Sequence, residues 1–217
     1  MRNNHKFAEF EESMVIYMSI VMHFLDLFGG ALVSLPLVMI FAFVFDKERA
    51  QKKWLWLILY VLYLNAMLII VGVPGFSYIT WQPMINLIPF QDLSLSNIMG
   101  MILNIVMLVP FGFFLPVYFS RYQKWYDTLA AGLLMSFLIE VIQLFTFRAS
   151  DIDDLLMNTL GTAIGFAFAK IFLRHRKHAN KEHRDLLKLV VINSVVLVVI
   201  IFIRYPMMAS IYACILD

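Results

Sequence analysis

The chain has few charged residues and a single cysteine. Charged residues make up 15% of its 217 positions and hydrophobic residues 62%, with a mean hydropathy of +0.81. This balance excludes a soluble globular domain and indicates a polytopic membrane protein. Cys214 can form no disulfide within the chain, and no nearby histidine accompanies it to suggest a zinc site. We therefore expect neither redox chemistry nor structural zinc, and no cofactor.

Other common signals are also missing. The chain shows no internal repeat and no low-complexity stretch, so one domain is the economical interpretation. The polar start Met1 to Ser13 is followed by no small-residue cleavage site, and no cleavable signal is expected. The net charge of +2 says little by itself, and we expect no nucleic-acid partner.

Long apolar runs dominate what is present. A transmembrane helix needs about 20 apolar residues. Five runs come close, at residues 29–45, 54–72, 98–119, 129–147 and 155–173, and a sixth near 187–203 is shorter and carries Asn193. Glu9 to Phe28 mixes acidic and apolar residues, and Gly29-Gly30 would end it. The predicted fold is all-α, a transmembrane bundle of five to six spans with an N-terminal amphipathic or re-entrant helix, or an extra span in its place.

Basic residues predict the orientation, because cytoplasmic loops retain lysine and arginine. The predicted loop Asp46 to Lys53 holds four basic residues, Ser120 to Thr128 holds two, and Arg174 to Lys188 holds six. The connection Val73 to Asn97 holds none, and Arg148 stands alone against three aspartates in the next connection. These two connections are expected to face outward, and the longer one to cap the bundle.

Polar residues recur at helical spacing in three consecutive runs. Residues three, four and seven apart share a helix face. The three sets are Asn97, Gly100 and Asn104; Glu140 and Gln143; and Asp154, Asn158, Gly161 and Gly165. Because such groups are costly when they face lipid, we expect the three faces to meet in an outward-opening polar cleft, with Glu140 about two turns below the surface.

Several residues in this region have a structural interpretation as well. Ser150 and Asp153 match a capping box, which alone would explain Asp153. Glu140 could pair with Arg148, and Asn104 and Asn158 could hydrogen-bond neighbouring helices and do no more. Gly161 and Gly165 form a small-xxx-small pair that favours close helix packing. Pro110, followed by Gly112, predicts a kink in its helix.

The same residues carry a family resemblance. Asn86-Leu-Ile-Pro-Phe, the stretch from Asn104 to Pro116, Glu140-Val-Ile-Gln, and Arg148 with the following Ser-Asp-Ile-Asp-Asp-Leu-Leu-Met-Asn resemble the VanZ family of bacterial membrane proteins over about residues 86–173. The motif positions are Asn86, Asn104, Pro110, Gly112, Glu140, Gln143, Arg148, Asp151, Asp153, Asp154, Asn158 and Gly161. The chain then divides into an N-terminal segment 1–28, a transmembrane hairpin 29–80, a VanZ-like core 81–173, and a basic cytoplasmic loop with a C-terminal apolar helix 174–217.

The resemblance implies a function in the envelope of Gram-positive bacteria. Its founding member is associated with resistance to the glycopeptide teicoplanin without altered cell-wall precursors. We therefore expect a multi-pass protein of the bacterial cell membrane, without enzymatic activity, whose cleft binds a lipid head group, a lipid-linked cell-wall precursor or the antibiotic. The candidate ligand-binding residues are Asn86, Asn104, Glu140, Gln143, Arg148, Asp151, Asp153, Asp154 and Asn158, beside the structural residues Pro110, Gly112, Gly161 and Gly165.

Two other classes remain open. The first is an enzyme that modifies a lipid-linked substrate, in which Asp151, Asp153 and Asp154 offer the oxygen ligands that Mg²⁺ or Ca²⁺ prefers and Glu140 acts as a general acid or base. Its outer motif contains no serine, cysteine or histidine placed as a nucleophile. The second is a transporter, although no repeat relates two halves of the chain. The ligand and the oligomeric state are not predicted.

Overall fold

The computed structural model describes residue 21 and residues 29–81, 83–146, 149–174 and 184–216. Its helices are Gly29–Phe45, α2 (Lys47–Val71), α3 (Leu95–Tyr118), α4 (Trp125–Gln143), α5 (Ile152–Leu173), α6 (Asp185–Val198) and α7 (Tyr205–Leu216). Short 3₁₀ turns lie at η1 (Phe76–Tyr78) and η2 (Ser120–Gln123), and a π-helical stretch, η3 (Val199–Arg204), joins α6 to α7. The strands β1 (Ile85–Asn86) and β2 (Ser150–Asp151) have two residues each.

Five of these helical stretches are long and apolar enough to cross a membrane. They are Lys47–Tyr78, Leu95–Tyr118, Trp125–Gln143, Ile152–Leu173 and Asp185–Ser210, and Gly29–Phe45 is a shorter apolar helix. Helices suit this environment because each satisfies its own backbone hydrogen bonds where lipid offers none. The predicted all-α transmembrane bundle is confirmed. The predicted N-terminal helix of residues 9–28 falls almost entirely outside the described residues.

α3 and α5 form the closest helix pair, and glycine makes this approach possible. A Cβ atom added to Gly161 would lie 2.2 Å from the carbonyl oxygen of Ile105, and one added to Gly165 would lie 1.9 Å from that of Val109. From the opposite side, a Cβ on Gly112 would lie 2.0 Å from the carbonyl oxygen of Thr162. α3 continues through Pro110 as one helix.

Charged residues at one end of the bundle belong to helices, although the sequence predicted loops there. Asp46 is the N-cap of α2 and accepts a hydrogen bond from the backbone N–H of Arg49, so residues 47–53 lie in the first turns of this helix. The backbone departs from helical geometry only at Lys53, whose ammonium donates to the carbonyl oxygens of Val117 and Tyr118. Likewise, α4 begins at Trp125, inside the predicted loop Ser120 to Thr128.

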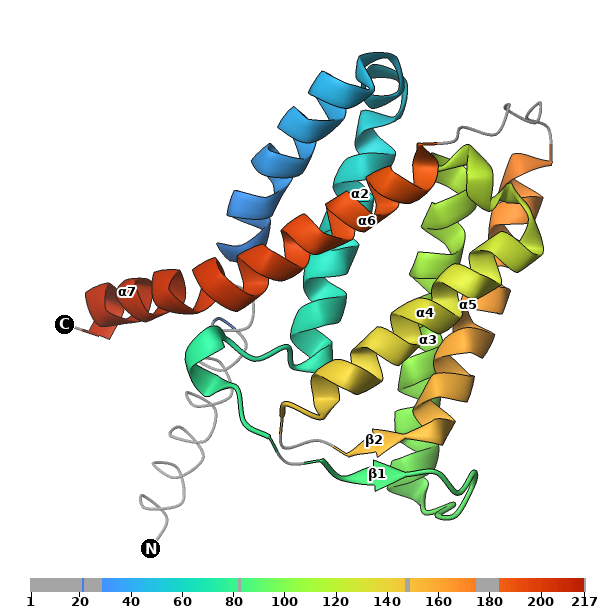
Figure 1. The fold of residues 1–217 in the computed structure, drawn as a ribbon, viewed down its shortest axis with the longest axis vertical. Coiled ribbons are helices and arrows are strands. Elements are labelled where there is room, and N and C mark those ends of the chain that lie inside the picture. Colours follow the sequence, from blue (N-terminus) through green and yellow to red (C-terminus); the bar gives the residue numbers. More distant parts are fainter. Residues whose placement is uncertain (1–20, 22–28, 82, 147–148, 175–183, 217) are drawn as a thin grey trace, which may run out of the picture.

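The opposite end, hereafter the strand end, holds the long connection between α2 and α3. β1 pairs in parallel with β2, so that Ile85 lies beside Ser150 and Asn86 beside Asp151. Figure 1 shows this strand pair next to the first turns of α3 and α5. Thr80 N donates to the carbonyl oxygen of Phe145, which ties the same connection to the end of α4. The sequence predicted a cap here but not its strands.

The C-terminal apolar run is longer than predicted. α6, η3 and α7 follow one another without a break and cross beside α2 (Figure 1). Gly29 and Gly30 are the first two residues of the helix Gly29–Phe45, and the helix that they were predicted to end falls almost entirely outside the described residues. A Cβ on Gly30 would come 2.6 Å from Asn65 Oδ1. Close packing between helices therefore accounts for this glycine.

Candidate functional site

The predicted polar faces of α3, α4 and α5 meet at the strand end of the bundle. Asn104 from α3, Glu140 and Gln143 from α4, and Asp154 and Asn158 from α5 line one cavity of about 30 Å³. A larger cavity of about 270 Å³ is lined by Asn104 and Asp154 together with Asn97, Asp151 and Asp153. Because Asn104 and Asp154 border both, the two cavities are neighbours. We call the pair the polar cleft.

Glu140 lies in the last turn of α4, closer to the helix end than the sequence predicted. The helix ends at Gln143, and the chain turns directly after it. Thr146 stabilises this turn, since its backbone N–H and its hydroxyl both donate to the carbonyl oxygen of Gln143 over 3.0 Å. Glu140 is only 6% exposed, and its Oε2 accepts a hydrogen bond of 2.9 Å from the backbone N–H of Asp151. Its Oε1 has no hydrogen-bond partner among the described residues.

Asn158 presents its amide oxygen in the same way. Its Nδ2 donates to Ser136 Oγ over 3.1 Å, while the Ser136 hydroxyl donates to the carbonyl oxygen of Leu155 over 3.5 Å. This chain of donors fixes the amide orientation, because the serine lone pair is the acceptor and Asn158 Oδ1 is left on the other side. Both Asn158 Oδ1 and Gln143 Oε1 are buried without a partner in the described part of the chain.

Asn86, Asp151 and Asp153 satisfy one another and the backbone around them. Asn86 Nδ2 donates to Asp151 Oδ2 over 3.0 Å, and Asp151 Oδ1 accepts from the backbone N–H of Asp153 over 2.9 Å. Asp151 is thus the N-cap of α5, one residue later than the predicted capping box at Ser150. Both carboxylate oxygens of Asp153 accept from the backbone N–H of Phe90 at 3.0 Å. The structure therefore gives these three candidates intramolecular partners.

Arg148 lies outside the described residues, so its predicted pairing with Glu140 stays a prediction. The described residues contain no group of three or more acidic, histidine or cysteine side chains placed to hold a metal ion. Asp151, Asp153 and Asp154 are thus brought to one end of α5 but do not converge as a set of metal ligands.

The sequence did not predict Ser136, which lies beside the cleft, or the apolar residues of the cleft lining. Ser136 is fully buried and positions Asn158. Helical spacing could have predicted it, because it lies four residues before Glu140 on the same helix face. Ile70 from α2 and Met107 from α3 line both cavities. No pattern in the sequence distinguishes these apolar residues from those that face lipid.

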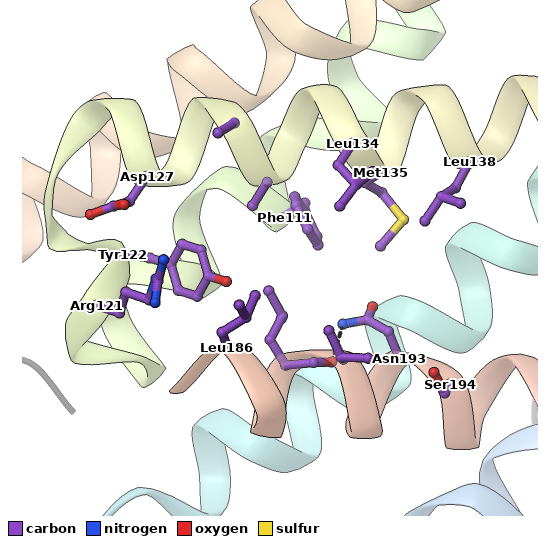
Figure 2. Close-up of a pocket in the computed structure, with 14 residues that line it drawn as sticks. Phe111, Arg121, Tyr122, Asp127, Leu134, Met135, Leu138, Leu186, Asn193 and Ser194 are labelled. Carbon is purple, nitrogen blue, oxygen red and sulfur yellow. Dashed lines mark hydrogen bonds between the residues drawn. The ribbon is translucent and has the colours of Figure 1, made fainter. Parts of the chain in front are cut away.

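Another cavity lies at the opposite end and has a different character. It measures about 280 Å³ and its lining is mainly apolar. Figure 2 shows Leu134 and Leu138 of α4 facing Leu186 and Asn193 of α6 across it, with Tyr122 at one end. Burial raises the pKa of the Tyr122 phenol, which stays protonated. None of the predicted site residues lines this cavity, so it is separate from the polar cleft.

Comparison with known proteins gives two matches. A family model described as VanZ/LLP1 matches residues 57–173, which include most of α2 and all of α3, α4 and α5. Protein VanZ of Enterococcus faecium is 30% identical over 150 residues, which is 69% of this chain and 83% of that protein. No solved structure matches the chain. The matched region contains every residue that lines the polar cleft.

Proposed function

This chain belongs to the VanZ family, and we propose that it lowers the susceptibility of a bacterial cell to teicoplanin-like glycopeptide antibiotics by binding a polar ligand in its cleft. The observation that carries this proposal is the set of three buried acceptor atoms, Glu140 Oε1, Gln143 Oε1 and Asn158 Oδ1, which have no partner among the described residues.

Such atoms are costly in the absence of a ligand. A buried polar group without a hydrogen bond costs on the order of 1–3 kcal/mol, and more if it is charged. Three of them lie around one cavity at the end of two membrane spans. Polar groups are retained at such depth for a function or for a specific partner. A bound ligand would supply the hydrogen-bond donors that the described residues do not.

The position of the cleft suits a ligand of the envelope. The strand end holds no lysine or arginine between Val73 and Asn97, which favours an outward-facing position in the bacterial cell membrane. A lipid head group, a lipid-linked cell-wall precursor or the antibiotic itself would reach the cleft there.

The test is a measurement of glycopeptide susceptibility in a sensitive bacterial host that expresses the chain. Glu140→Ala and Asp154→Ala should each abolish protection, while the protein level in the membrane stays at that of the unmodified chain. Glu48→Ala is the matched control, because Glu48 is exposed and its pair with Lys52 lies at the opposite end. Full protection in both cleft variants would contradict the proposal.

A further inference from the structure

The buried atoms of the cleft that have no hydrogen-bond partner among the described residues are all acceptors, and this restricts the ligand. Glu140 Oε1, Gln143 Oε1 and Asn158 Oδ1 come from two helices and line the same small cavity. Each belongs to a side chain that is at most 6% exposed. A ligand group that enters must donate hydrogen bonds, so a phosphate or carboxylate, which only accepts, does not fit.

A primary ammonium matches this set in number and charge. It carries three N–H donors and no acceptor, and its positive charge compensates a buried carboxylate. A hydroxyl group donates only one hydrogen bond. The cavity of about 30 Å³ has room for a group the size of a water molecule, which needs roughly 10–15 Å³, whereas a trimethylated ammonium is larger and has no N–H.

The neighbouring cavity indicates that the ammonium belongs to a lipid. Its lining includes Ile70 of α2 and Leu103 of α3, which are 66% and 59% exposed and lie on membrane-spanning stretches. Apolar side chains with this exposure face the lipid, so the larger cavity is accessible from the bilayer side. Asn97 and Asn104 line the same cavity, and their side-chain amides provide a polar surface for the rest of a head group.

We propose that the small cavity between α4 and α5 binds the primary ammonium of an aminolipid head group such as ethanolamine, held by Glu140, Gln143 and Asn158. This deepens the proposed function, because it names the ligand class of the same cleft.

The test compares lipids that differ in their N–H donors. The purified full-length protein is reconstituted in nanodiscs with equal amounts of phosphatidylethanolamine, phosphatidylcholine and phosphatidylglycerol. Native mass spectrometry then quantifies the lipids that stay bound when the protein is released from the nanodiscs. We expect phosphatidylethanolamine to be retained at least about tenfold over phosphatidylcholine, because choline carries the charge without the donors.

Variants assign the preference to the cavity. Glu140→Gln keeps an acceptor for the Asp151 N–H but removes the charge, and Asn158→Leu removes an acceptor. Each variant should bring the ratio of bound phosphatidylethanolamine to bound phosphatidylcholine close to one. Glu48→Gln, at the exposed pair, should leave it unchanged. Equal retention of ethanolamine and choline lipids by the unmodified protein would overturn the proposal without any variant.

Two further outcomes also overturn it. The cavity would belong to a soluble amine if methylammonium chloride stabilised the protein against unfolding more than tetramethylammonium chloride does and phosphatidylethanolamine were not retained. If phosphatidylethanolamine were preferred over phosphatidylcholine only by the Arg148→Ala variant and not by the unmodified protein, the guanidinium of Arg148 would be the cation that occupies the cavity. A lost lipid preference with intact Glu140-dependent protection in cells rejects only this inference, and the reverse result rejects only the proposed function.

Discussion

At the residue scale, glycine allows α3 and α5 to pack backbone against backbone. Replacing Gly165 by leucine would place a side chain where the Val109 carbonyl oxygen lies 1.9 Å from the new Cβ. Backbone atoms of two packed helices cannot move aside as a flexible side chain does. We therefore expect the free energy of unfolding to fall by about 1–3 kcal/mol or more. Thermal unfolding of the purified protein in detergent measures it.

Gly100 provides the control for this substitution. It lies on α3 as well, but a Cβ added there meets nothing within 4 Å. Gly100→Ala should therefore leave the unfolding temperature unchanged or raise it slightly, because alanine favours the helix by roughly 1 kcal/mol. Equal losses in the two variants would contradict the packing argument.

Asp153 has a second role that can be tested at a single backbone amide. Both of its carboxylate oxygens accept from Phe90 N, and Phe90 has a φ of 55°, which a non-glycine residue adopts at a cost. Asp153→Ala leaves that N–H without its acceptor, at a cost of about 1–3 kcal/mol. Hydrogen exchange at residues 87–93 should speed up at least tenfold, and exchange within α3 should not change.

Some of these residues could be predicted from the sequence and some could not. Glu140, Gln143, Asn104 and Asn158 were predicted to converge because helical periodicity determines which residues share a face. The partner of Asp153 could not be, since it is a backbone N–H 63 residues away that only the folded connection brings near. Spacing indicates which side chains turn inward, not which backbone groups meet them.

At the element scale, the end opposite the strand pair is held by charges from α2 and α6. Asp185 is fully buried; its Oδ1 lies 2.5 Å from Arg49 Nη1 and its Oδ2 accepts from Arg121 N over 2.9 Å. Lys188 contacts Asp46 over 2.7 Å in the same group. These contacts tie the C-terminal stretch to the start of α2 and, through Arg121, to the region matched by the family model.

Removing one carboxylate from this group should destabilise the fold strongly. Asp185→Asn leaves the Arg49 guanidinium with less compensating charge in a buried place, and we expect a loss of about 3–5 kcal/mol. Lys52→Ala breaks the exposed pair between Lys52 and Glu48, whose side chains are 72% and 81% accessible, and should leave stability nearly unchanged. Denaturant unfolding of both variants in detergent measures the contrast, and equal effects would contradict it.

Helices were easier to predict than their ends. Each long apolar run became a helix because the membrane admits few alternatives to one. Their limits were misplaced wherever charged residues extend a helix beyond its apolar part, as at Lys47, or where a turn ends it early, as after Gln143. Caps and turns depend on local backbone hydrogen bonds, which hydropathy does not report.

At the scale of the whole molecule, the two ends differ in chemistry. One end holds the ion pairs of Asp46 and Asp185, and the other holds the polar cleft and the strand pair. Since positively charged segments remain on the cytoplasmic side, this asymmetry predicts that the cleft faces outward. The function proposed for the cleft depends on that orientation, because a glycopeptide acts at the outer surface.

Thiol labelling tests the orientation directly. Cys214 is replaced by serine, and single cysteines are introduced at Ser96, exposed near the start of α3, and at Gln51, exposed near the start of α2. A membrane-impermeant maleimide should label S96C in intact cells, whereas Q51C should react only after the membrane is permeabilised. Labelling of Q51C alone in intact cells would reverse the orientation. It would also remove the aqueous route from the outer surface to the cleft, leaving a lipid ligand as the compatible class.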